Sequence, residues 1–154
     1  MPDVSHPFRY YLRVRYAECD AQKVVFNARY AEYVDLATTE FIRALGYGEA
    51  LISGQLDFQV VKQTIEWKAP ARFDQVLEVS VEAARLGTTS FALRAEFRIA
   101  GEDLVLAFVE TVYVLVEPHS LAKTPLPSEF RAALERGAPG TTTDHAGYAA
   151  AAAR

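Results

Sequence analysis

Residues 27–46, NARYAEYVDLATTEFIRALG, have the periodicity of a long amphipathic helix. No Gly or Pro interrupts residues 28–45. Apolar side chains recur there at intervals of three, seven and four residues, at Ala31, Val34, Phe41 and Leu45. Asn27 is suited to cap the start of this helix and Gly46 to end it. A helix over residues 28–45 would be about 27 Å long.

Segments of alternating polarity, typical of half-buried strands, lie on both sides of this helix in the sequence. One precedes it and four follow, at residues 9–16, 58–68, 75–85, 88–99 and 104–117. The last of them is apolar on both faces, which indicates a strand inside the sheet. Short connections with Pro or Gly join the later strands, so we expect antiparallel pairing. One helix against such a sheet is an α+β two-layer fold.

The length and composition of the chain fit one domain with a substantial core. Of the 154 residues, 51% are hydrophobic and 23% are charged, which is ordinary for a soluble domain. We expect the domain to occupy residues 1–136, with a last short helix at 128–136. Residues 137–154 are rich in Ala, Thr and Gly, and we expect them to be poorly ordered.

Charge and cysteine content argue against several classes of function. The net charge is −4 and no dense run of Lys and Arg occurs, so nucleic acid is not expected as a partner. Cys19 is the only cysteine and has no partner for an internal disulfide. Residues 1–9 lack the apolar core of a secretory signal, and no apolar segment is long enough to span a membrane. These features predict a cytoplasmic protein without a membrane partner.

The segment that leads into the helix, YAECDAQKVVFNARY at residues 16–30, resembles the signature of the 4-hydroxybenzoyl-CoA thioesterase family. Weaker similarity continues at residues 69–74, 89–91 and 125–127, so that it extends over residues 9–135. The resemblance implies the hotdog fold, in which one long central helix is wrapped by a mainly antiparallel sheet of five to six strands. It also implies hydrolysis of an acyl- or aryl-CoA thioester, without a cofactor or metal, by a homodimer or homotetramer with sites between subunits.

By this resemblance Asp20 is the central catalytic residue. Its carboxylate would either attack the thioester carbonyl or act as a base on water, and the sequence leaves both routes open. The alternative is that Asp20 only stabilises a turn, a common role for Asp. A backbone N–H group near Asn27, at the start of the helix, would stabilise the oxyanion. Asn27 is therefore the second candidate catalytic residue.

For the substrate, Val25, Phe26 and Tyr30 would form an apolar wall beside the attacking acid. Arg72 is the first candidate to contact the phosphates of CoA. Other cations that suit this role are Lys62, Lys68 and Arg85.

Other polar residues give weaker candidates. Asp35 and Glu40 lie on different faces of the helix, because five residues turn it about 140° beyond one full turn; each is expected to be a solvated acid. Cys19 is expected to point away from Asp20 and to pack. The three histidines lie outside the quoted segment, at His6, His119 and His145, which argues against a metal site and against a hydratase.

A non-catalytic hotdog module that binds an acyl or aromatic ligand, or assembles with a partner, remains the alternative.

Overall fold

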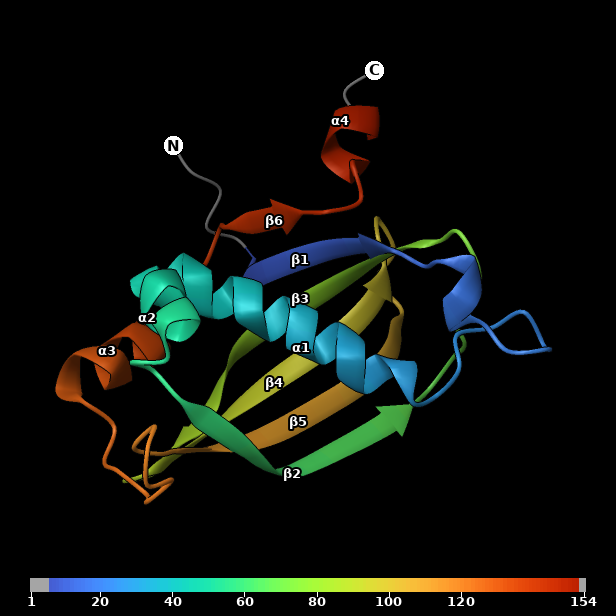
Figure 1. The fold of residues 1–154 in the computed structure, drawn as a ribbon. Coiled ribbons are helices and arrows are strands. Elements are labelled where there is room, and N and C mark those ends of the chain that lie inside the picture. Colours follow the sequence, from blue (N-terminus) through green and yellow to red (C-terminus); the bar gives the residue numbers. More distant parts are fainter. Residues whose placement is uncertain (1–5, 153–154) are drawn as a thin grey trace.

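In the computed structural model, which describes residues 6–152, one long helix lies along one face of a six-stranded sheet (Figure 1). The strand order in the sheet is β2-β5-β4-β3-β1-β6. Its strands are β1 (Phe8–Arg13), β2 (Phe58–Trp67), β3 (Val76–Leu86), β4 (Ser90–Ile99), β5 (Val105–Leu115) and β6 (Thr142–Asp144). The helices are η1 (Tyr16–Glu18), α1 (Arg29–Ile42), η2 (Arg43–Tyr47), α2 (Gly48–Ser53), α3 (Ser128–Arg136) and α4 (Tyr148–Ala152).

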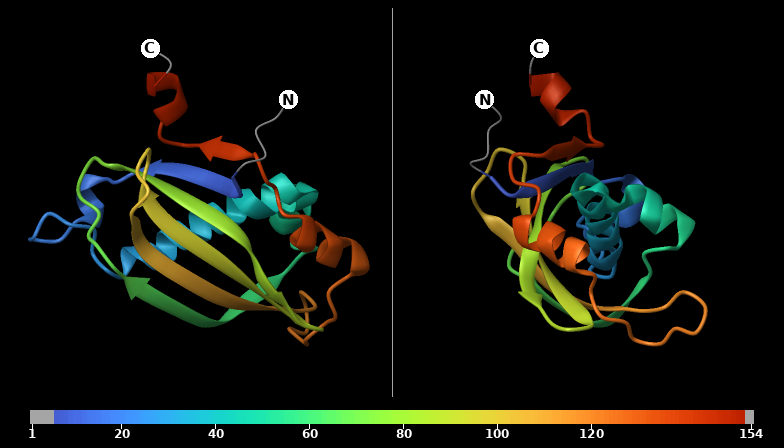
Figure 2. Two further views of the ribbon diagram at one scale, coloured as in Figure 1. Left: turned by 180° about the vertical axis from the view of Figure 1, so that it is seen from behind. Right: turned by 90° about the vertical axis from the view of Figure 1, so that its left-hand side faces the viewer.

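The sheet confirms the predicted pairing. Among the described residues, the pairs β1–β3, β3–β4, β4–β5 and β5–β2 are antiparallel, and β1–β6 is parallel. β5, which is apolar on both faces, lies between β2 and β4, inside the sheet as expected. Seen from behind and from the side, the strands curve around α1 (Figure 2). This is the predicted hotdog fold.

Aromatic side chains fill the space between α1 and the sheet. The rings of Phe41 and Phe8 lie 5.6 Å apart, and those of Tyr30 and Phe97 lie 5.2 Å apart. All four side chains are buried. Because truncation of a buried Phe to Ala costs about 3–5 kcal/mol, these contacts fix how α1 lies on the strands. The residues in the first turn of α1 are therefore held at a defined place relative to the sheet.

Both ends of the long helix differ from the sequence prediction. Ala28, in α-helical conformation and without a side-chain cap, takes the N-cap position, so the prediction for Asn27 was wrong. Instead, the carbonyl groups of Phe26 and Asn27 accept the first hydrogen bonds, from Arg29 and Tyr30. At the other end α1 stops at Ile42 and continues through η2, a π-helical turn, into α2. Gly46 (φ 96°) marks the kink inside this turn rather than the end of the helix.

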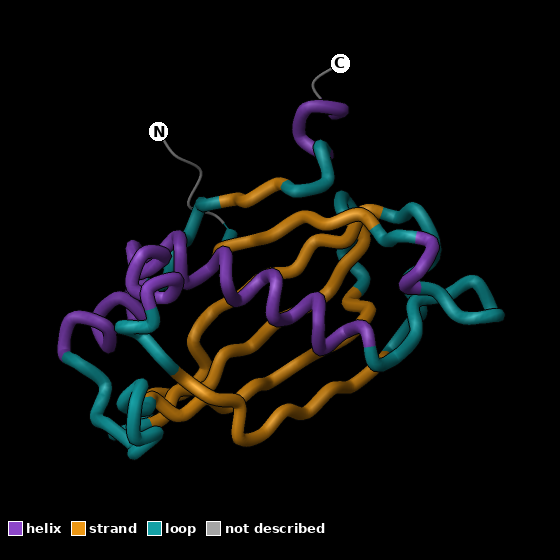
Figure 3. The backbone as a smooth tube through the Cα atoms, in the orientation of Figure 1, coloured by secondary structure: helices purple, strands orange, loops and turns teal. Residues whose placement is uncertain are grey.

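Most of the C-terminal segment, which the sequence predicts to be poorly ordered, packs on the domain in the structure. β6 runs parallel to β1 along its free edge (Figure 3). A hydrogen bond of 2.8 Å joins the His145 Nδ1 atom to the Tyr10 hydroxyl. The rings of Tyr148 and Tyr11 lie with their centroids 4.9 Å apart. The sequence gives no sign of this, because a three-residue strand is too short to show alternation.

No helix within residues 6–152 is long and apolar enough to cross a membrane.

Candidate active site

The segment between β1 and α1 folds into a tight loop at the N-terminal end of the helix (Figure 1). It starts with one turn of 3₁₀ helix, η1 (Tyr16–Glu18). The chain then turns back on itself, because the Asp20 N–H donates to the Val24 carbonyl at 2.9 Å. The Phe26 N–H donates to the Glu18 carbonyl, also at 2.9 Å, and closes the base of the loop. Asp20 is thereby held toward the tip of the loop that leads into α1.

Asp20 combines a turn-stabilising role with a place in a pocket. Its Oδ1 atom accepts a hydrogen bond from the Gln22 N–H at 2.8 Å, as in the alternative interpretation of this residue. Lys23, the fourth residue of the turn, takes the left-handed conformation (φ 65°). Asp20 also lines a pocket of about 560 Å³, together with Tyr16, Cys19, Ala21, Lys23 and Phe73. That volume is within the range of small-molecule sites.

Free amide groups lie at the start of α1. Within residues 6–152 the N–H groups of Asn27 and Ala28 have no hydrogen-bond acceptor. Asn27 and Ala28 are both exposed. Unpaired N–H groups at the positive end of a helix dipole are suited to bind a developing negative charge. The structure therefore offers, near Asn27, the kind of donor that the sequence predicts.

The predicted substrate-binding residues divide into two groups. Val25 and Tyr30 are 6% and 2% exposed and belong to the core, so they do not offer a surface to a ligand. Phe26 is 47% exposed, and Arg72 is exposed as well. An isolated β-bridge between Val24 and Arg72 places Arg72 against the loop that carries Asp20. Of the four, Phe26 and Arg72 remain available to a substrate.

Two aromatic residues that the sequence analysis missed contribute to the pocket. Tyr16 and Phe73 are 81% and 50% exposed, and their rings meet edge to face with centroids 5.8 Å apart. The alternation of residues 9–16 places Tyr16 on the apolar face with Val14, but the chain leaves β1 after Arg13 and Tyr16 turns outward. No signal in the sequence marks this change of direction.

Glu18 was also missed. Its side chain is only 4% exposed and is hydrogen-bonded to Arg15 and to Tyr33. Its spacing of two residues from Asp20 gives no sign that one acid is buried while the other lines a pocket.

Cys19 does not point away from the site, contrary to the prediction. It lines the same pocket as Asp20, although the chain at Cys19 is extended (φ −98°, ψ 150°), so alternation along the chain does not separate the two side chains here. Partial burial and the carboxylates of Glu18 and Asp20 raise the pKa of the Cys19 thiol. A raised pKa keeps the thiol protonated and makes it a poor nucleophile, so Asp20 remains the stronger candidate.

Comparison with known proteins identifies the family of the chain. The model of the family described as "Thioesterase superfamily" matches residues 22–106, more than half of the chain. The chain belongs to the thioesterase superfamily.

Named relatives of this superfamily member act on CoA thioesters. The acyl-CoA thioester hydrolase YbgC of Escherichia coli O6:H1 is 32% identical over 124 residues, which are 80% of this chain and 92% of that protein. A 1,4-dihydroxy-2-naphthoyl-CoA hydrolase of Synechococcus elongatus is 25% identical over 121 residues, 77% of this chain and 88% of that protein.

Similar solved structures confirm the fold. The gentisyl-coenzyme A thioesterase BH1999 is 28% identical and superposes with a TM-score of 0.72 over 82% of this chain and 98% of that chain. The PA5185 protein of Pseudomonas aeruginosa is 26% identical, with a TM-score of 0.78 over 86% of this chain and 92% of that one. The hotdog fold is thus shared along nearly the full length of these proteins.

Neither Asp35 nor Glu40, the two candidate acids of α1, lines the Asp20 pocket of this thioesterase. Asp35 is exposed, as predicted. Glu40 differs from the prediction, since its side chain is only 13% exposed and pairs with Arg43 at 3.0 Å and with His145 at 3.7 Å. Glu40 therefore belongs to a cluster with the C-terminal segment, in the last turn of α1.

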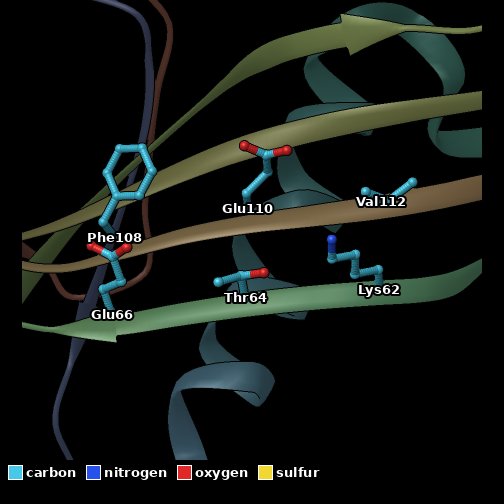
Figure 4. A pocket seen from close by; sticks show the side chains of 6 residues that line it. All are labelled: Lys62, Thr64, Glu66, Phe108, Glu110 and Val112. Atoms are coloured by element: carbon cyan, nitrogen blue, oxygen red, sulfur yellow. The ribbon is translucent and has the colours of Figure 1, made fainter.

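A second, smaller pocket lies on the face of the sheet turned away from α1 (Figure 4). It has a volume of about 160 Å³ and is lined by Lys62, Thr64, Glu66, Phe108, Glu110 and Val112. Two carboxylates against one ammonium group do not favour the phosphates of CoA. Of the other candidate cations, Lys68 pairs with Glu66 and Arg85 pairs with Glu110. Lys23, which lines the Asp20 pocket, and Arg72, which is bridged to the same loop at Val24, are better placed.

Within residues 6–152, no group of three or more His, Cys, Asp and Glu side chains is arranged to hold a metal ion. The absence of a metal or other cofactor stays a prediction.

Proposed function

We propose that this protein hydrolyses acyl-CoA thioesters and that Asp20 is the carboxylate at which the reaction occurs. The observation that carries the proposal is the place of Asp20 in a ligand-sized pocket, on the loop that leads into the free N–H groups at the start of α1. The similarity to the hydrolase YbgC supports the substrate class. The cytoplasmic location expected from the sequence stays a prediction.

Two reaction routes are compatible with Asp20. In the first, the carboxylate attacks the thioester carbonyl, the C–S bond breaks to release CoA, and water then hydrolyses the mixed anhydride. In the second, the carboxylate takes a proton from a water molecule as that water attacks the carbonyl. Both routes give the free acid and CoA, and both pass through a tetrahedral oxyanion.

The oxyanion would be stabilised by backbone rather than side-chain groups. The free N–H groups of Asn27 and Ala28 point from the positive end of the α1 dipole. Loss of a single oxyanion donor typically slows an enzyme by about 100- to 1000-fold. In this proposal Asn27 acts through its backbone N–H group, so its side chain is not essential.

The acyl group would lie against aromatic side chains. Tyr16 and Phe73 form the exposed aromatic part of the pocket, and Phe26 is exposed nearby in the chain. These residues take the role that the sequence analysis gave to Val25 and Tyr30. We therefore propose a medium- or long-chain acyl group or an aryl group rather than acetyl. Lys23 and Arg72 would contact the phosphates of CoA.

We further propose that the active form is a homodimer or a larger homo-oligomer. Among the described residues, β2 pairs with β5 on one side only and is the outermost strand. Val60, Val61 and Trp67 on this strand are 51%, 58% and 51% exposed. An open edge with exposed apolar side chains is suited to pair with the same edge of a second copy.

A panel of acyl-CoA substrates with a thiol reagent tests the proposal. The native protein should release CoA from at least one substrate. Asp20→Asn keeps the shape of the side chain but removes its charge, so turnover should fall by about 100-fold or more, while KM changes little. Gel filtration and the melting temperature serve as controls for the fold. Absence of CoA release from every substrate, or normal turnover by Asp20→Asn, would contradict the proposal.

A further inference from the structure

A buried carboxylate lies two residues before Asp20. The Glu18 side chain is 4% exposed. Its Oε1 atom accepts hydrogen bonds from the Arg15 N–H and the Tyr33 hydroxyl, both at 2.8 Å. Its Oε2 atom accepts from Arg15 Nε at 3.0 Å and from Arg15 Nη2 at 2.6 Å. Four donors thus converge on one carboxylate.

These donors keep Glu18 ionised. Burial alone would raise the pKa of its carboxyl group, but the hydrogen bonds from the side chain and backbone of Arg15 and from Tyr33 outweigh burial and lower it. An ionised carboxylate accepts about four hydrogen bonds, and Glu18 receives that number. It has no lone pair left to take a proton from water or substrate, so it is not itself a catalytic group.

The bonds of Glu18 join three parts of the site. Arg15 follows β1, and Tyr33 lies on the second turn of α1 with its side chain 1% exposed. The Glu18 carbonyl accepts the N–H of Phe26, where the loop returns to the helix. Glu18 therefore links the entry of the loop, its exit and the helix that carries the free N–H groups.

Asp20 is rigidly connected to this junction. A β-bridge joins Cys19 to Val25, and the Asp20 N–H is bonded to the Val24 carbonyl. Any shift of Glu18 relative to α1 is therefore passed on to Asp20. Displacement of a reacting group by about 1 Å can reduce turnover by about 100-fold.

Stability alone is a weak explanation for such a group. Replacing a buried ion pair by well-packed apolar residues is often neutral or stabilising, because desolvation offsets the attraction of the charges. Arg15 is 74% exposed in its side chain, so solvent further weakens this pair. A requirement for one defined geometry explains the buried charge better.

We propose that Glu18 is a positioning residue, which sets the distance between the Asp20 carboxylate and the oxyanion-binding end of α1 through its bonds to Tyr33 and Arg15. This inference rests on the proposed function of Asp20.

Four single variants of the full chain test it: Glu18→Gln, Tyr33→Phe, Asp20→Asn and the control Glu102→Gln, an exposed acid in the β4–β5 turn. kcat and KM are measured with the best substrate of the acyl-CoA panel, at a temperature at which circular dichroism shows every variant to be folded. Glu18→Gln replaces one of the two accepting oxygens by an NH2 group, which then faces two donors, and kcat should fall by roughly 10- to 100-fold with KM within about threefold. Tyr33→Phe removes one donor and should lower kcat by about three- to tenfold. Glu102→Gln should match the native protein.

A purely structural role would lower the melting temperature but leave kcat per folded molecule unchanged. If Glu18→Gln does not fold, Tyr33→Phe still decides the question. Near-native kcat of folded Glu18→Gln and Tyr33→Phe, or an effect on KM alone, would overturn the positioning role. If Asp20→Asn is inactive in the same experiment, the proposed function still stands. Full turnover by Asp20→Asn would instead overturn the proposed function together with this inference.

Discussion

The two edges of the sheet are completed in different ways. At the β1 edge, the C-terminal segment supplies β6, and the Arg9 N–H bonds to the Thr141 carbonyl at 3.1 Å. At the opposite edge, β2 has no further strand beside it within residues 6–152. β1 contributes mainly buried side chains, whereas most of the side chains of β2 are exposed.

This difference indicates where a second copy of the chain would bind. A free strand edge presents unpaired N–H and C=O groups, and natural proteins either cover such an edge or use it for association. Within residues 6–152, the tail covers one edge, and the longer edge, with its exposed Val and Trp side chains, has no strand beside it. We therefore expect assembly along β2 and none along β1.

The largest effect is expected from a charge placed on the open edge. In a symmetric dimer Val61→Asp brings two like charges near each other, which costs several kcal/mol and should weaken association by about 100-fold or more. Sedimentation velocity at micromolar concentration should then detect the 17.1 kDa monomer. Leu104→Asp, at a residue with a similar exposure of 63%, is the control and should leave assembly unchanged. A native protein that is already monomeric would contradict the assignment of this edge.

A smaller effect is expected from removal of the tail at the covered edge. A chain that ends at Ala138 loses β6 and the contacts of His145 and Tyr148 with β1. Its melting temperature should fall by about 4–8 °C, as for a loss of about 2 kcal/mol in a domain of this size. kcat/KM should stay within about twofold, because none of these contacts involves the Asp20 pocket.

Differential scanning calorimetry and the CoA-release assay measure both quantities. A chain that ends at Ala149 keeps His145 and Tyr148 and serves as the control. An unchanged melting temperature would mean that the tail is dispensable, as its composition alone suggests.

The smallest effect is expected from Glu40→Gln, which weakens the link between α1 and the tail at His145. The contact is long and half exposed, so the melting temperature should fall by only about 1–2 °C. Activity should stay within about twofold, and Asp35→Asn should behave in the same way. An inactive Glu40→Gln variant beside an active Asp20→Asn variant would place the reaction on the helix instead.

The fold of this protein follows from local sequence patterns. The helical period of residues 28–45 predicts one helix. One alternating segment before it and four after it predict an antiparallel sheet. The structure confirms the helix, these strands and their pairing. Such patterns are strong because each element must turn one apolar face to the common core. The quoted segment around Asp20 likewise led to the thioesterase superfamily, which the comparisons confirm.

The surroundings of individual side chains were decided by tertiary packing. Tyr30 and Tyr16 are both aromatic residues near Asp20 in sequence, yet Tyr30 is 2% and Tyr16 81% exposed. Glu18 is buried because Tyr33, fifteen positions later, reaches it across the loop. The tail is held by Tyr10, more than a hundred residues before it. Periodicity tells which face of an element is apolar, but contacts between distant segments determine what covers that face, and only the folded chain brings those segments together.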